Sequence, residues 1–229
     1  MRFLAVGDAP PFTFKIVNGV RQEQEAPKGS LPPREVVIPV RQGKKEGQDT
    51  LGLRLGTIGA PKLVSAGDVV IRGKNAGEEA RPWASLKMPE SSAALSVVFR
   101  DPRQKTWDAV LSITMADDLR AFPLGAVRFA NATPFAASVV FQGKKSDLKP
   151  GQVLVVPGKT GGVFQEEQLA VGVLDSKGRL KRIFDSAISQ GRGERTNVVI
   201  HWSDGERPRR PAKVLIQRER PALRALPKE

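Results

Sequence analysis

The chain has 229 residues, enough for one large domain or for two domains of about 100–120 residues each. It contains no cysteine, which excludes disulfides, thiolate metal ligands and cysteine nucleophiles. Its formal net charge of +13 favours anionic polymers, anionic surfaces or acidic proteins as partners and says nothing about the fold.

The N-terminal half predicts short strands separated by turns. A first strand over residues 12–17 ends at Asn18-Gly19, a pair typical of a two-residue hairpin turn. The polar residues 21–30, which include a proline and a glycine, predict a loop. The alternation over residues 106–113 predicts a strand that carries Trp107 and Leu111 on one face.

The second half continues the same rhythm. Strands are expected over 127–130, 135–141, 153–156, 169–174, 180–188, 196–202 and 213–216. No window longer than a few residues holds the apolar spacing of an amphipathic helix. We therefore predict an all-β protein whose strands form β-sandwiches.

Asp117-Asp118-Leu119-Arg120 is the expected domain junction. The prediction is two tandem β-sandwich domains, immunoglobulin-like in the broad sense, over residues 1–117 and 118–220, followed by a frayed tail over 221–229. Parts of the strand and turn pattern occur in both halves. This recurrence reflects either a duplication or the rhythm that all β-domains share.

Few residues offer chemistry. His201 is the only histidine, and a metal site needs several converging ligands, so a structural role is favoured over a site formed with Ser203 and Asp204. Asp117 and Asp118 are adjacent and would point apart on a strand, which favours a linker or cap over an acid–base pair. We predict no catalytic residue, no metal ligand and no cofactor.

The three tryptophans lie in alternating segments. Trp83, Trp107 and Trp202 are therefore expected to fill the cores of the sandwiches. The alternative is that they are exposed platforms on which sugars stack.

The basic residues are concentrated near the C-terminus. Residues 176–229 hold 14 of the lysines and arginines against six carboxylates, so this stretch accounts for most of the net charge. A surface for an anionic polymer or an acidic partner is one hypothesis, and a solvated basic surface is the other. The candidate residues are Arg179, Arg182, Arg207, Arg209 and Arg210.

Four segments carry a resemblance. They are RFLAVGDAPPF at 2–12, SLPPRE at 30–35, FPLGAVRFANATP at 122–134 and DLKPGQ at 147–152. With them the chain resembles exported β-sandwich proteins of Verrucomicrobia-type bacteria, a group with no known activity. The resemblance implies export to the periplasm or cell surface. At the level of fold alone, the chain is also similar to immunoglobulin-like proteins of bacterial pili and envelopes.

The N-terminus bears on the compartment. Its apolar run stops at Asp8, so residues 1–12 do not make a signal peptide, and no apolar run approaches the roughly 18–20 residues of a membrane span. We expect an exported protein whose signal peptide is absent from this chain; the alternative is a cytoplasmic one.

The expected function is a non-catalytic structural module, for adhesion or assembly in the bacterial cell envelope, with another envelope protein as its partner. The motivation is the strand-rich sequence, the resemblance and the lack of a nucleophile, base or metal set. The alternative is a binding module for anionic polymers or acidic partners that uses the basic C-terminal stretch.

Overall fold

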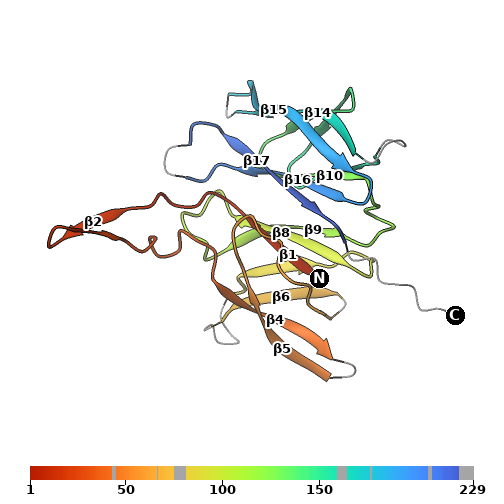
Figure 1. The fold of residues 1–229 in the computed structure, drawn as a ribbon. Coiled ribbons are helices and arrows are strands. Elements are labelled where there is room, and N and C mark those ends of the chain that lie inside the picture. Colours follow the sequence, from red (N-terminus) through yellow and green to blue (C-terminus); the bar gives the residue numbers. More distant parts are fainter. Residues whose placement is uncertain are drawn as a thin grey trace. The chain divides into compact units, whose positions relative to one another are not determined.

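The structure is a computed structural model that describes residues 1–42, 45–65, 67–74, 81–158, 164–175, 177–205 and 208–221. Over these residues the chain is all-β, with seventeen strands and no helix, so the all-β part of the predicted fold is confirmed (Figure 1). No helix long and apolar enough to cross a membrane occurs in the described ranges.

The contacts divide the chain into two compact units. Unit 1 comprises Met1–Asp117 together with His201–Arg210, and unit 2 comprises Asp118–Ile200 with the residues from Pro211 onward. The first division follows Asp117. The segment 201–210 groups with unit 1, although it lies inside the second predicted domain in the sequence.

Two larger sheets enclose the core of unit 1. The first has the order β1-β8-β9, in which β1 runs parallel to β8 and β9 is antiparallel to it. The second has the order β5-β4-β6-β7 and is antiparallel. The strands are β1 Arg2–Val6, β4 Glu35–Gln42, β5 Lys45–Gly52, β6 Asp68–Gly73, β7 Ala84–Lys87, β8 Ala94–Arg100 and β9 Val110–Ala116.

Apolar side chains from both sheets share this core. Phe3 of β1, Ile38 of β4 and Ile71 of β6 are almost fully buried in one cluster, which also contains Trp83 and Trp107. The prediction that these two tryptophans fill a core is thus confirmed. Trp202 is only half-buried.

Trp107 corrects one strand prediction. The residue precedes β9, which begins at Val110, so it does not share a strand face with Leu111. Trp107 is 1% exposed, whereas Leu111 is 41% exposed. Trp107 lies in the segment before β9 joins the sheet. Its backbone carbonyl accepts a hydrogen bond of 2.6 Å from Nε1 of Trp83.

A third sheet of unit 1 consists of β2 Phe14–Val17 and β3 Val20–Glu23 alone. The predicted loop over 21–30 is therefore wrong for residues 21–23, which pair with β2. The reason is that neither face of β3 is buried, so its sequence lacks the alternation that marks a half-buried strand.

Unit 2 has two four-stranded sheets around one core. Their orders are β13-β10-β16-β17 and β12-β11-β14-β15. Side chains of both sheets, among them Phe129 of β10 and Phe141 of β11, form the cluster, which makes this unit β-sandwich-like. The strands are β10 Val127–Ala132, β11 Ala137–Phe141, β12 Lys144–Leu148, β13 Val153–Val156, β14 Phe164–Leu174, β15 Leu180–Gly191, β16 Arg195–Trp202 and β17 Ala212–Glu219.

Candidate functional site

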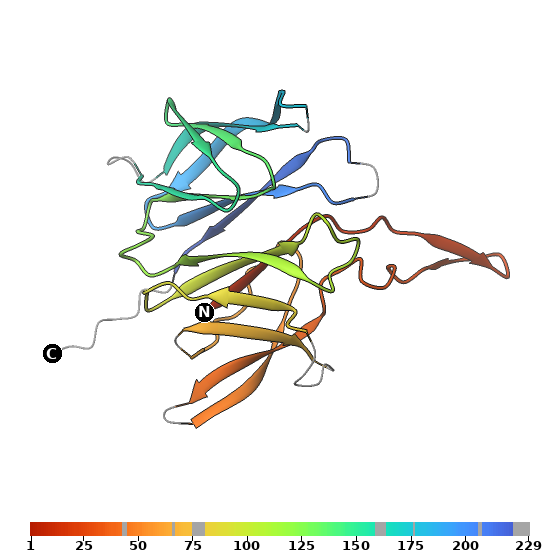
Figure 2. The same ribbon diagram turned by 180° about the vertical axis from the view of Figure 1, so that it is seen from behind.

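A hairpin arm, defined here as residues 12–24, extends away from the two larger sheets of unit 1. Figures 1 and 2 show it in red from opposite sides, with β2 and β3 projecting beyond the ends of the other strands of that unit. All four side chains of β3 are exposed, as are three of the four in β2. The arm therefore contributes almost nothing to the apolar core.

The turn at the tip explains why the arm forms. Asn18 and Gly19 have φ angles of 52° and 77°, and a two-residue hairpin turn of this kind needs positive φ at both positions. Asparagine and glycine adopt such angles at low cost. The predicted turn is confirmed, and the hydrogen bond of 2.8 Å from the Gln24 N–H to the Thr13 carbonyl extends the ladder beyond the strands.

Apolar side chains line the arm. Phe14 and Ile16 alternate along β2 and so share one face, with exposed fractions of 46% and 74%, and Phe12, just before the strand, is 79% exposed. Val20, opposite Val17 beside the turn, is 61% exposed. The Arg21 guanidinium lies 3.8 Å from the centre of the Phe14 ring, a cation–π contact. An apolar surface on a segment that buries no core is typical of an interaction site.

The arm is anchored at its C-terminal end. The backbone N–H of the core residue Trp107 donates a hydrogen bond of 2.8 Å to the Gly29 carbonyl. Gly29 has a φ of +76°, and a Cβ placed on it would lie 2.9 Å from the Thr106 side chain, so glycine is required. Beside this anchor lies a hollow of about 730 Å³, whose lining includes Phe12 and Leu31.

The candidate arginines divide between the two units. Arg179 and Arg182 belong to unit 2, whereas Arg209 and Arg210 belong to unit 1 and are exposed. Arg207 lies outside the described residues. The structure therefore does not bring the five residues together on one unit.

The two arginines of unit 2 already have carboxylate partners. Arg179 lies 2.9 Å from Asp175, and Arg182 lies 2.6 Å from Asp185. The backbone N–H of Arg179, its guanidinium and the Lys177 N–H donate to Asp175 and hold the pKa of that carboxyl below its usual range. These ion pairs reduce the positive field that either arginine offers to a polyanion.

Asp204 lies two residues after the end of β16 and is held by other residues of unit 1. Its Oδ1 accepts a hydrogen bond of 2.6 Å from the Asp8 backbone N–H, and its Oδ2 lies 3.1 Å from Nε of Arg100. The Gly205 N–H donates to the Asp8 carboxylate at 3.2 Å. Nothing in the sequence predicts these contacts, because Asp8 and Arg100 lie 196 and 104 residues from Asp204 along the chain and leave no local signal.

The remaining polar candidates have structural roles. His201 is buried, and its Nδ1 lies 3.0 Å from the Trp202 carbonyl. Asp117 forms a hydrogen bond of 3.0 Å with Nε of Arg2, whereas Asp118 accepts from two backbone N–H groups as a turn cap. The cap interpretation is confirmed for Asp118. No group of three potential metal ligands occurs among the described residues.

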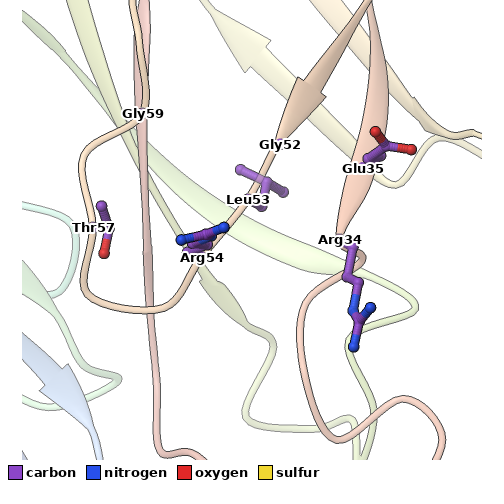
Figure 3. Close-up of a pocket in the computed structure, with 7 residues that line it drawn as sticks. All are labelled: Arg34, Glu35, Gly52, Leu53, Arg54, Thr57 and Gly59. Atoms are coloured by element: carbon purple, nitrogen blue, oxygen red, sulfur yellow. The ribbon is translucent and has the colours of Figure 1, made fainter.

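A second hollow of unit 1, of about 820 Å³, was not indicated by the sequence. Figure 3 shows Arg34 and Glu35 on one side of it and Arg54 and Thr57 on the other. Glu35 is ion-paired with Lys74. Arg34, Glu35, Arg54 and Thr57 are all exposed, so water solvates their polar groups.

Taken together, these features describe an all-β protein whose most distinctive feature is an exposed, partly apolar hairpin arm. Comparison with models of known protein families gave no match, and a search of curated proteins gave none either.

Proposed function

We propose that this chain is a non-catalytic structural module, for adhesion or assembly in the bacterial cell envelope, which attaches through the hairpin arm. The observation that carries the proposal is the exposure of Phe14, Ile16 and Val20 on a two-stranded sheet that stands apart from the core. An isolated two-stranded hairpin is only marginally stable in water, so a bound partner would stabilise it.

Two further points support this proposal. Unit 2 has two four-stranded sheets around one core. A chain of two β units is consistent with tandem domains that are immunoglobulin-like in the broad sense. The resemblance to exported proteins supports a location in the periplasm or at the cell surface, and a further envelope component would be the partner.

Cell fractionation tests the role of the arm. We expect the protein, expressed in its native bacterium, to be recovered with the envelope, and the double variant Ile16→Ser/Val20→Ser to shift to the soluble fraction. Leu63→Ser is the matched control, because Leu63 is 71% exposed elsewhere in unit 1. Recovery of all three proteins in the same fraction would contradict the proposed function.

Binding of anionic polymers is a second candidate function, favoured by the exposure of Arg209 and Arg210 between Pro208 and Pro211. Each phosphate contact contributes about −0.9 to the slope of log affinity against log salt for duplex DNA. We expect Arg209→Ala/Arg210→Ala to make that slope shallower by about 1–2 and to elute earlier from heparin.

The control for this measurement is Arg179→Ala/Arg182→Ala. It removes the same charge from the two candidate arginines of unit 2, so a larger effect of Arg209→Ala/Arg210→Ala would locate binding at residues 209 and 210. Equal effects of the two double variants would show that net charge alone governs binding. No binding to heparin or DNA at low salt would eliminate this second function.

A further inference from the structure

We propose that the hairpin arm docks on the surface of an anionic lipid bilayer, an inference that rests on the proposed function and names the partner of the arm. The partner is identified from the distribution of charge and apolar surface along the arm.

Charge is distributed unevenly along the arm. The register pairs Phe14 with Glu23, and the eight residues beyond this pair, 15–22, include the cations Lys15 and Arg21 and no carboxylate. Glu23 lies at that pair, and Glu25 lies beyond it, away from the turn. The far end of the arm therefore carries a local charge of the sign that anionic headgroups attract.

Apolar surface is found at the same end. Ile16, Val17 and Val20 lie beside the turn, and Phe14 lies three residues before Val17, the last residue of β2, with the Arg21 guanidinium over its ring. Strands rise about 3.3 Å per residue, so Phe14 lies about 10 Å from the end of the strand. This distance is comparable with the insertion depth of interfacial segments, whose apolar face is buried roughly 5–10 Å into the boundary between headgroups and acyl chains.

Lysine and arginine suit such a boundary because their stems are apolar and their charged ends reach the phosphates. Lys15 lies on the face of β2 opposite Phe14 and Ile16, and Arg21 lies across the ladder from Ile16. Both cations can thus contact headgroups while the apolar side chains lie deeper.

A second copy of the chain fits the arm less well. Each copy carries a net charge of +13 and the same two cations at the tip, so two arms would repel each other. This objection does not apply to a negatively charged bilayer.

The chain has no cysteine, so a single engineered thiol allows a direct test. Val20→Cys at the tip and Leu63→Cys as the control would each carry an environment-sensitive fluorophore. The probes are vesicles of phosphatidylcholine alone and of phosphatidylcholine with phosphatidylglycerol in a two-to-one ratio. We expect a blue shift of the label at position 20 with the anionic vesicles only, and no shift at position 63.

Partition measured by co-sedimentation gives an independent readout. We expect Ile16→Ser/Val20→Ser to lower partition onto anionic vesicles at least about tenfold, because two apolar side chains no longer leave water. Partition of the unaltered protein should fall with added salt.

The inference would be overturned by no partition onto anionic vesicles, by partition with no response of the label at position 20, or by equal partition onto neutral vesicles. Arm-dependent self-association in the absence of lipid would also overturn it, in favour of a second copy. If vesicle binding fails while the envelope association of cells still depends on Ile16 and Val20, then the proposed function stands and its partner is a protein.

Discussion

Replacing Arg195 with alanine is expected to lower the free energy of unfolding by about 3–5 kcal/mol, the range found when one partner of a buried ion pair is removed. Its Nη2 lies 2.8 Å from Oε1 of Glu219, and the two side chains are 4% and 14% exposed. The guanidinium also lies 4.9 Å from the centre of the buried Phe122 ring. Alanine would remove the Arg195 charge from beside the Glu219 carboxylate, which lies in a poorly hydrated site.

Urea denaturation followed by far-ultraviolet circular dichroism measures this effect. The matched control is Arg182→Ala, whose ion pair with Asp185 is exposed and should contribute less than about 1 kcal/mol. Arg195→Met/Glu219→Leu should recover much of the loss, because apolar replacement of a whole buried pair is often nearly neutral. If Arg195→Ala is no less stable than Arg182→Ala, the ion pair does not stabilise unit 2.

Trp107→Ala is expected to cost about 3–5 kcal/mol by leaving a large cavity in the core of unit 1. The side chain is 1% exposed and closely packed, since a Cβ on Gly7 would lie only 2.9 Å from its Cζ2. The indole N–H is buried and has no hydrogen-bond acceptor among the described residues. Trp107→Phe keeps much of the packing and removes this unsatisfied donor, so its cost should be clearly smaller.

The same denaturation experiment ranks these variants. We expect Trp107→Ala to unfold at the lowest urea concentration, Trp107→Phe at a higher one, and the exposed control Leu63→Ala close to the unaltered protein. A small effect of Trp107→Ala would mean that the core collapses around the site. An equal loss of stability in Trp107→Phe and Trp107→Ala would mean that the indole itself, rather than its packed volume, stabilises unit 1.

The arm and the cores use apolar residues differently. In the cores, apolar side chains of facing sheets remove each other from water, which stabilises the fold. On the arm, Phe12 and Ile16 remain in water and are available for a partner. Variants of the arm should therefore change binding and leave the stability of the sheets nearly unaltered, whereas Trp107 and Arg195 variants should do the reverse.

Local sequence was sufficient for the fold class and several turns. Alternation and turn residues predicted β11 and β13, and Asn18-Gly19 predicted the hairpin tip, because period-two burial and positive φ are properties of neighbouring residues. The apolar content of the arm is also visible in the sequence. Its exposure is not, since an alternating strand looks the same whether or not another sheet covers it.

The tertiary structure alone decided the rest. Residues 21–23 form a strand because they pair with β2, Trp107 is buried although it lies outside β9, and Asp204 is held by Asp8 and Arg100. It also decided which arginines have carboxylate partners. These features depend on contacts between residues far apart in the chain or on burial by other elements, and such contacts leave no periodic pattern in the sequence itself.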